Sequence, residues 1–213
     1  MNMSVFKEKI KYWWTLLYPI VYFACFYLVE NRTPEKIHYM TMKIDYAIPF
    51  CEWFIFFYYA WFIYLVLGFA YLFFFDKKNY LKMMTALYIG MTLFIIVSVI
   101  YPNGLDLRPA YVPNRNIACV LVNQIYASDT PTNVLPSIHV FNSVGLAMAM
   151  CYCDVSPQVK IGNWILAILI ILSTLFVKQH SIIDGLVACI LYLILYYFVY
   201  VKDYYFLKNT LDE

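Results

Sequence analysis

Six long apolar runs constrain the fold of this chain more than any other feature of its sequence. Each is close to the ~20 residues that a helix needs to cross the hydrocarbon core of a bilayer. The chain is 64% hydrophobic and 13% charged, whereas a soluble domain has about 45–50% apolar and about 25% charged residues. These proportions exclude a soluble enzyme, a nucleic-acid-binding module and a second globular domain. The runs are Trp13–Val29, Trp53–Phe75, Met83–Ile100, Val134–Cys151, Ile161–Val177 and Ile182–Val201.

We therefore predict an all-α integral membrane bundle of six transmembrane helices, with residues 1–213 forming a single membrane domain. Lysine and arginine accumulate on the cytoplasmic side of such bundles. Nine of them fall on one side, against six on the other, which predicts both termini in the cytoplasm (N-in, C-in). The short loops favour a multi-pass protein of the cell membrane. The larger set is Lys7, Lys9, Lys11, Lys77, Lys78, Lys82, Lys160, Lys202 and Lys208, and the smaller is Arg32, Lys36, Lys43, Arg108, Arg115 and Lys178.

The cysteines and histidines give no indication of a metal or another cofactor. Most of the six cysteines lie in or beside apolar runs, where free cysteine behaves as a small buried hydrophobe. The sequence contains no CxxC pair and no HExxH motif, so neither a structural zinc site nor a zinc protease is indicated. We expect no cofactor and no metal.

Among the aspartates, glutamates, lysines, arginines and histidines, only two fall inside the predicted spans, His139 and Asp184. An ionisable group at membrane depth is costly and by default indicates a functional site, rather than a mere hydrogen bond between helices. Both lie near the predicted outer ends of their spans, on the face that also carries the loop 101–133 and His180. We therefore expect a site at this end of the bundle. His38 lies in a polar loop and is expected to be a solvated surface residue.

Three short motifs follow one another between the third and sixth spans. They are Arg108-Pro109; Pro136-Ser137-Ile138-His139; and Ser173, six residues, His180, three residues and Asp184. In this order and spacing they resemble the motifs of the type 2 phosphatidic acid phosphatase superfamily of integral membrane enzymes, and the resemblance places the catalytic core at about residues 83–201. The chain departs from the pattern where Tyr101, Ile138 and Thr174 replace the family's Lys, Gly and Arg. This incomplete pattern is most similar to the branch that contains inositolphosphoceramide synthase and sphingomyelin synthase.

The residue types suggest how the site acts on phosphorus. An imidazole can attack phosphorus when its other nitrogen donates to a carboxylate, and His180 and Asp184 are four residues apart, as neighbours on a helix are. His139 is a second imidazole that could protonate the departing oxygen. The resemblance implies the same roles, with a phosphohistidine intermediate at His180. Cations and hydroxyls must surround the phosphoryl oxygens. The predicted phosphate-binding residues are Arg108, Lys178, Ser137 and Ser173.

The motifs leave two enzymes open, because hydrolysis and transfer share the first half of the reaction. One is a lipid phosphatase at the outer face of the membrane, and the other is a phosphotransferase that moves a phosphorylated headgroup to a lipid hydroxyl. The expected partner is a phospholipid or an isoprenoid-lipid phosphate, because the reacting groups lie at headgroup depth and no soluble domain remains to capture a polar substrate. Alternatives from other classes are an inactive scaffold and an ion or proton-coupled transporter. A transporter predicts ionisable groups at the midplane and a repeat, neither of which the sequence indicates.

Overall fold

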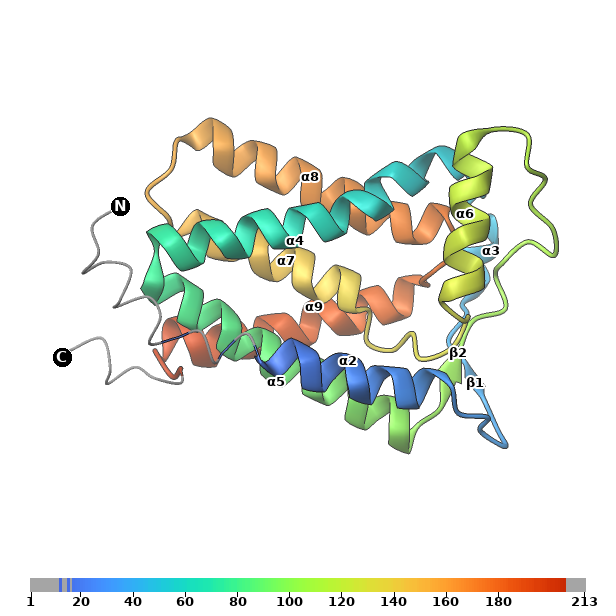
Figure 1. The fold of residues 1–213 in the computed structure, drawn as a ribbon, viewed down its shortest axis with the longest axis horizontal. Helices are drawn as coiled ribbons and strands as arrows, with labels where there is room; N and C mark the ends of the chain where they lie inside the picture. Colours follow the sequence, from blue (N-terminus) through green and yellow to red (C-terminus); the bar gives the residue numbers. More distant parts are fainter. Residues whose placement is uncertain (1–11, 13–14, 16, 206–213) are drawn as a thin grey trace.

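The computed structural model describes residues 12, 15 and 17–205, and this part of the chain is mostly helical (Figure 1). Two short strands and two irregular helical turns, η2 and η3, complete it. In chain order the elements are α2 (Leu17–Glu30), β1 (His38–Tyr39), α3 (Lys43–Ala47), η2 (Glu52–Phe54), α4 (Ile55–Phe75), α5 (Lys77–Ile100), β2 (Asn103–Gly104), α6 (Ile117–Ser128), α7 (Ile138–Cys151), α8 (Pro157–Phe176), α9 (Ile182–Tyr196) and η3 (Tyr197–Val201).

Four of these helices are long and apolar enough to cross a membrane, which confirms that apolar helices dominate the fold. They are Glu52–Phe75, Lys77–Ile100, Pro157–Phe176 and Ile182–Val201. The other two predicted runs correspond to shorter helices, α2 and α7, of 14 residues each. Residue 13, where the first predicted run begins, lies outside the described residues, as do Lys7, Lys9, Lys11 and Lys208 of the charge count.

Of the helices after α2, three begin four or more residues from the start of the predicted run; for one of them, α8, the run begins at Ile161 and the helix at Pro157. The fourth run was expected to be helical from Val134, but α7 begins at Ile138 because Ser137 caps it, its hydroxyl accepting a hydrogen bond from the Val140 N–H at 3.3 Å. The third run was expected to begin at Met83, but α5 begins six residues earlier, where Asp76 accepts from the Asn79 N–H. The first turns of α5 contain an acidic cap and three lysines, so they are too polar to belong to an apolar run, but these residues are compatible with a helix.

The earlier start of α5 brings three lysines, Lys77, Lys78 and Lys82, into a helix that is long enough to cross a membrane. Lys82 is buried in α5 and its ammonium lies 2.7 Å from the carboxylate of Asp203. The expectation that only His139 and Asp184 occupy spans therefore does not hold for the helices as they form. Lys82 lies at the opposite end of the bundle from α6 and the small sheet, so it is remote from the predicted site.

Helix α7 runs through the middle of the bundle and packs against α4, α5, α8 and α9 (Figure 1). Most of its residues are buried. At 1.5 Å per residue it is about 21 Å long, shorter than its neighbours, and those neighbours cover it. Because protein surrounds the start of α7, polar side chains can lie there inside the bundle.

Contact between α5 and α7 depends on a glycine. A Cβ placed at Gly90 would lie 2.1 Å from Cζ of Phe141, a fully packed ring. We expect Gly90→Ala to destabilise the protein by about 1–3 kcal/mol, the usual range for overpacking a core. Thermal unfolding in detergent measures this. Gly162→Ala is the matched control, since a Cβ there meets nothing within 4 Å and alanine favours helix. Equal melting temperatures for the two variants would contradict the packing argument.

One end of the bundle gathers the small elements (Figure 1). Strands β1 and β2 pair in parallel there, with His38 opposite Asn103 and Tyr39 opposite Gly104. Helix α6 also lies at this end and packs against η2 and α4. The prediction of a loop between residues 101 and 133 is therefore wrong over α6. Asn116 caps α6 by accepting from the Cys119 N–H, a start signal that is visible in the sequence.

Candidate functional site

The predicted pair of His180 and Asp184 forms where α8 turns into α9. His180 lies in the turn and Asp184 in the first turn of α9, and Nδ1 of the imidazole is 2.8 Å from Oδ2 of the carboxylate. Since a carboxylate only accepts, Nδ1 carries the hydrogen and Nε2 is left with its lone pair. The other oxygen, Oδ1, accepts from the N–H and the hydroxyl of Ser181. Both residues are buried, so the carboxylate fixes the imidazole in one orientation.

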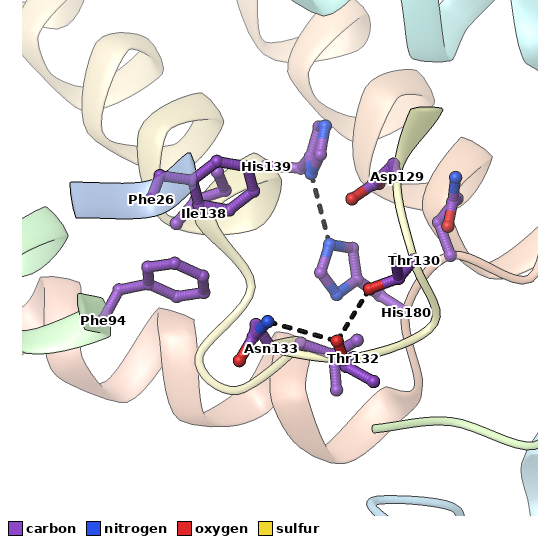
Figure 2. A pocket seen from close by; sticks show the side chains of 11 residues that line it. Phe26, Phe94, Asp129, Thr130, Thr132, Asn133, Ile138, His139 and His180 are labelled. Atoms are coloured by element: carbon purple, nitrogen blue, oxygen red, sulfur yellow. Dashed lines mark hydrogen bonds between the residues drawn. The ribbon is translucent and has the colours of Figure 1, made fainter. Parts of the chain in front are cut away.

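His139, in the first turn of α7, faces His180 directly. Its Nδ1 lies 3.2 Å from Nε2 of His180, and Figure 2 shows the two rings edge to edge across this contact. The rings of Tyr58 and Trp61, from α4, pack against the other side of His139 with centroids at 4.6 and 4.3 Å. Nε2 of His139 has no hydrogen-bond partner within the described part of the chain. Since Nε2 of His180 carries a lone pair, Nδ1 of His139 is the donor in this contact.

A small cavity opens beside the two imidazoles (Figure 2). Its volume of about 30 Å³ is enough for one or two water molecules. One side of the wall is apolar, with Phe26 of α2, Phe94 of α5 and Ile138 of α7, and the other is polar (Figure 2). The full lining is Phe26, Phe94, Asp129, Thr130, Thr132, Asn133, Val134, Ile138, His139, Gln179 and His180.

Arg108 lies behind the polar wall of this cavity and supports it. Its Nη1 donates to the backbone carbonyl of Asp129 at 2.8 Å, and its Nη2 donates to the side-chain oxygen of Gln179. The guanidinium also lies 4.5 Å above the ring of Tyr126. Burial lowers the pKa of Arg108, opposed by the nearby Asp129 carboxylate, and the group remains charged at any working pH. Its Nε has no partner among the described residues.

Gln179 is a site residue that the sequence motifs did not identify. It is 3% exposed, lines the cavity beside His180, and its side-chain NH2 has no partner among the described residues. Because its oxygen already accepts from Arg108, the guanidinium orients the amide. The free NH2 is therefore a donor positioned next to the nucleophile candidate. Its only signal in the sequence is that it directly precedes His180.

The two predicted serines have structural partners. Ser137 caps α7 through its hydroxyl, and its N–H donates to the backbone carbonyl of Asp184 at 3.2 Å, which joins the starts of α7 and α9. The hydroxyl of Ser173 donates to the carbonyl of Ile170 at 2.6 Å within α8. Neither serine is among the residues that line the cavity. Their part in phosphate binding stays a prediction.

The ammonium of Lys178 points toward α3 and not into the cavity. It donates to the backbone carbonyls of Asp45 and Ile48 at 2.9 and 2.5 Å, and Lys178 is absent from the cavity lining. Its backbone has φ of 55°, a left-handed conformation that turns the chain from α8 toward His180. Asp45 holds the other side of this turn, since its Oδ1 accepts from the Ile182 N–H at 2.9 Å.

We expect Lys178→Met to lower stability and to leave anion affinity unchanged. The substitution keeps the length of the side chain but removes the donor to two buried carbonyls, which should cost about 1–3 kcal/mol. Lys160→Met is the matched control: Lys160 donates to the Cys151 carbonyl, but at an exposed position, where the loss should be within about 0.5 kcal/mol. Thermal unfolding and phosphate binding are measured on both. Weaker phosphate binding by a Lys178→Met protein of normal stability would instead support the predicted phosphate contact.

The loop before α7 is held by two polar residues that come from distant parts of the sequence. The side-chain oxygen of Asn103 accepts from the N–H groups of Val134 and Leu135, both at 2.8 Å. The carboxylate of Glu30, at the end of α2, accepts from the Thr130 N–H at 2.8 Å and from the Asn133 amide at 2.9 Å. These bonds fix the loop that forms one wall of the cavity.

Asp129 contributes a second carboxylate to the site. It follows α6 and lines the cavity, where its side chain points toward the space beside the imidazoles (Figure 2). Burial raises the pKa of Asp129 to about 6, and the charge of Glu30 acts in the same direction, whereas Arg108 and His180 oppose it. The sequence motifs do not include Asp129.

The described residues include no group of three or more His, Cys, Asp or Glu placed to hold a metal ion. Comparison of the chain with protein-family models, with curated proteins and with solved structures finds no match.

Proposed function

We propose that the protein is a membrane-embedded lipid phosphate phosphatase that acts through a phosphohistidine at His180. One observation carries the proposal: a buried imidazole bonded to Asp184 at 2.8 Å turns its free nitrogen toward a second imidazole inside a cavity. An oriented nucleophile beside a proton donor is what phosphoryl transfer through a covalent intermediate requires. The motif resemblance to the type 2 phosphatidic acid phosphatase superfamily supports the same assignment.

The proposed reaction has two steps. Nε2 of His180 attacks phosphorus, a bond between nitrogen and phosphorus forms, and the bond from phosphorus to the lipid oxygen breaks. His139, as the imidazolium, gives one proton to that oxygen and is left neutral, and Asp184 stabilises the positive charge on the imidazole of His180. Water then attacks phosphorus and gives a proton to the neutral His139; the new bond from oxygen to phosphorus forms as the bond from Nε2 of His180 to phosphorus breaks, and inorganic phosphate leaves. Since Nε2 of His180 and Nδ1 of His139 are 3.2 Å apart, the substrate must replace this contact when it binds.

We further propose six spans, with both termini in the cytoplasm of a cell and the site at the outer face of its cell membrane. The cations on the site side have local partners that explain them without reference to topology. Four of the six bond to protein groups: Arg32 to Ser98 and Val99, Arg108 to Asp129 and Gln179, Arg115 to Glu52, and Lys178 to Asp45 and Ile48. Lys82 and Lys160 on the opposite side also bond to protein groups, so the proposed N-in, C-in orientation rests on the excess of nine cations over six.

A phosphotransferase is the second proposal, favoured by the partners of two residues at altered motif positions. Tyr101 stacks on the ring of His38 with centroids 4.2 Å apart, and the Thr174 hydroxyl donates to the carbonyl of Ile171. Neither can replace the cation of the family pattern. The site is then closer to the branch with inositolphosphoceramide synthase and sphingomyelin synthase, which passes a phosphorylated headgroup to a lipid hydroxyl.

One experiment tests both proposals. The purified protein in lipid nanodiscs receives a phospholipid or an isoprenoid phosphate with radiolabelled phosphorus, with and without a lipid that carries a free hydroxyl. Release of free phosphate at the same rate with and without the acceptor lipid supports the phosphatase. Transfer of the label to the acceptor lipid supports the transferase. A His180→Ala preparation gives the background. No turnover in either arm, or rapid turnover of a soluble phosphate without a lipid tail, contradicts both.

A further inference from the structure

The cavity beside the imidazoles is poorly charged for an anion. Among the described residues that line it there is one carboxylate, Asp129, and no lysine or arginine. The guanidinium of Arg108 lies behind the wall, bonded to the backbone carbonyl of Asp129 and to the side chain of Gln179. A phosphoryl group that enters with Asp129 ionised would place two negative charges together in a buried space, which is strongly unfavourable.

Among the residues that the structure describes, the carboxylate of Asp129 has no strong hydrogen-bond partner. Arg108 donates to the backbone carbonyl of Asp129 and not to its side chain. The hydrogen bond recorded for the carboxylate comes from the Tyr58 hydroxyl, at the long distance of 3.5 Å. The loop that carries Asp129 is fixed by Glu30, which binds the N–H of Thr130, so the side chain cannot easily leave the cavity. A buried acid in this position is suited to carrying a proton.

We propose that Asp129 binds the phosphate group of the substrate as a protonated carboxylic acid, so that binding of the anion takes up one proton. The protonated acid removes the negative charge from the cavity wall and adds an O–H donor beside the free NH2 of Gln179. This inference rests on the proposed function, since it assumes that the anion is the phosphate on which His180 acts.

The surroundings of Asp129 set the direction of the pH dependence. Its pKa is already raised to about 6 by burial, and a bound anion raises it further, because the two negative charges repel. Binding is therefore strongest below pH 6 and weakens by about tenfold per pH unit above it. The titratable and charged groups that face Asp129 are Tyr22 and Glu30 of α2, Tyr58 of α4, Arg108 of the loop after β2, His139 of α7, and His180.

The test uses a short-chain dialkyl phosphate, ethyl hexyl phosphate, which remains a monoanion between pH 5 and pH 8. Its affinity for the full-length protein in nanodiscs is measured by calorimetry in buffers of different ionisation enthalpy, which also gives the number of protons taken up. The variant is Asp129→Asn, whose amide keeps a donor but cannot ionise. Asp106→Asn is the matched control, because Asp106 bonds to Thr41 and Tyr46 outside the cavity and its pKa is lowered by those bonds.

We expect Asp129→Asn to take up one proton fewer than the wild-type protein at pH 7 and to bind the probe at least tenfold more tightly at pH 7.5. Asp106→Asn should match the wild type in both measurements. Equal proton uptake by the wild type and Asp129→Asn overturns the inference, and so does the absence of probe binding to the wild type over the whole range. Failure of the proposed function alone has a different signature, namely proton-linked binding with no turnover of any lipid phosphate.

Discussion

Replacement of His180 by alanine is expected to abolish turnover of a lipid phosphate, with a loss in kcat of about 10⁴-fold or more, the scale seen when a nucleophile is removed. The reason is chemical, because no other imidazole at the site has a carboxylate to stabilise its charged form. The structure pairs Asp184 with His180 alone among the histidines described. Radiolabelled substrate, quenched within one turnover at neutral pH, should leave label on the wild-type protein and none on the variant.

The third histidine provides the matched control. His38 lies on β1 and stacks on the ring of Tyr101 with centroids 4.2 Å apart, away from the cavity. His38→Ala should keep the label and most of the activity. His180→Gln separates folding from chemistry, since an amide can still donate to Asp184 but cannot form the intermediate. Label on the His180→Ala protein, or equal losses for His38→Ala and His180→Ala, would exclude His180 as the nucleophile.

Much of the fold follows from the sequence because lipid-facing helices must be apolar along their whole length. That signal locates α4, α8 and α9 within a few residues. It is misleading where a helix is covered by protein, as at the start of α7, whose run continues into a loop that Asn103 and Glu30 hold by side-chain bonds. A search for apolar runs of span length also misses α6, because its 12 residues are too few for a span.

The site was predictable where its members are close in sequence. The spacing of four predicts that His180 and Asp184 meet, and they do, although His180 lies just before α9 and the carboxylate reaches back to it from the first turn of that helix. The direction of Lys178 was not predictable, because it depends on a left-handed backbone at that residue and on the carbonyls of Asp45 and Ile48, far along the chain. Gln179 and Asp129 likewise acquire their positions from Arg108, whose two bonds reach them across the fold.

Replacement of His139 by alanine should slow the reaction by an amount that depends on the leaving group. A lipid alcohol is a poor leaving group and must receive a proton as its bond to phosphorus breaks, whereas an activated phenol leaves without one. General acid catalysis contributes about 10²–10⁴-fold, so His139→Ala should lose that much with an alkyl phosphate. With a phosphate ester of the activated phenol, the loss in rate should be within about tenfold, because only the positioning of His180 and the substrate is affected.

The leaving-group comparison separates proton transfer from packing, which a single rate cannot do. His139 packs against Trp61 and Tyr58, so its removal also leaves space among aromatic rings. Trp61→Phe disturbs the same packing but keeps the imidazole, and it should reduce the rates with both esters by the same small factor. Single-turnover rates with the two esters, on both variants, measure the difference. Equal losses for the alkyl and phenyl esters in His139→Ala would mean that His139 positions His180 through their 3.2 Å contact and does not protonate the departing oxygen.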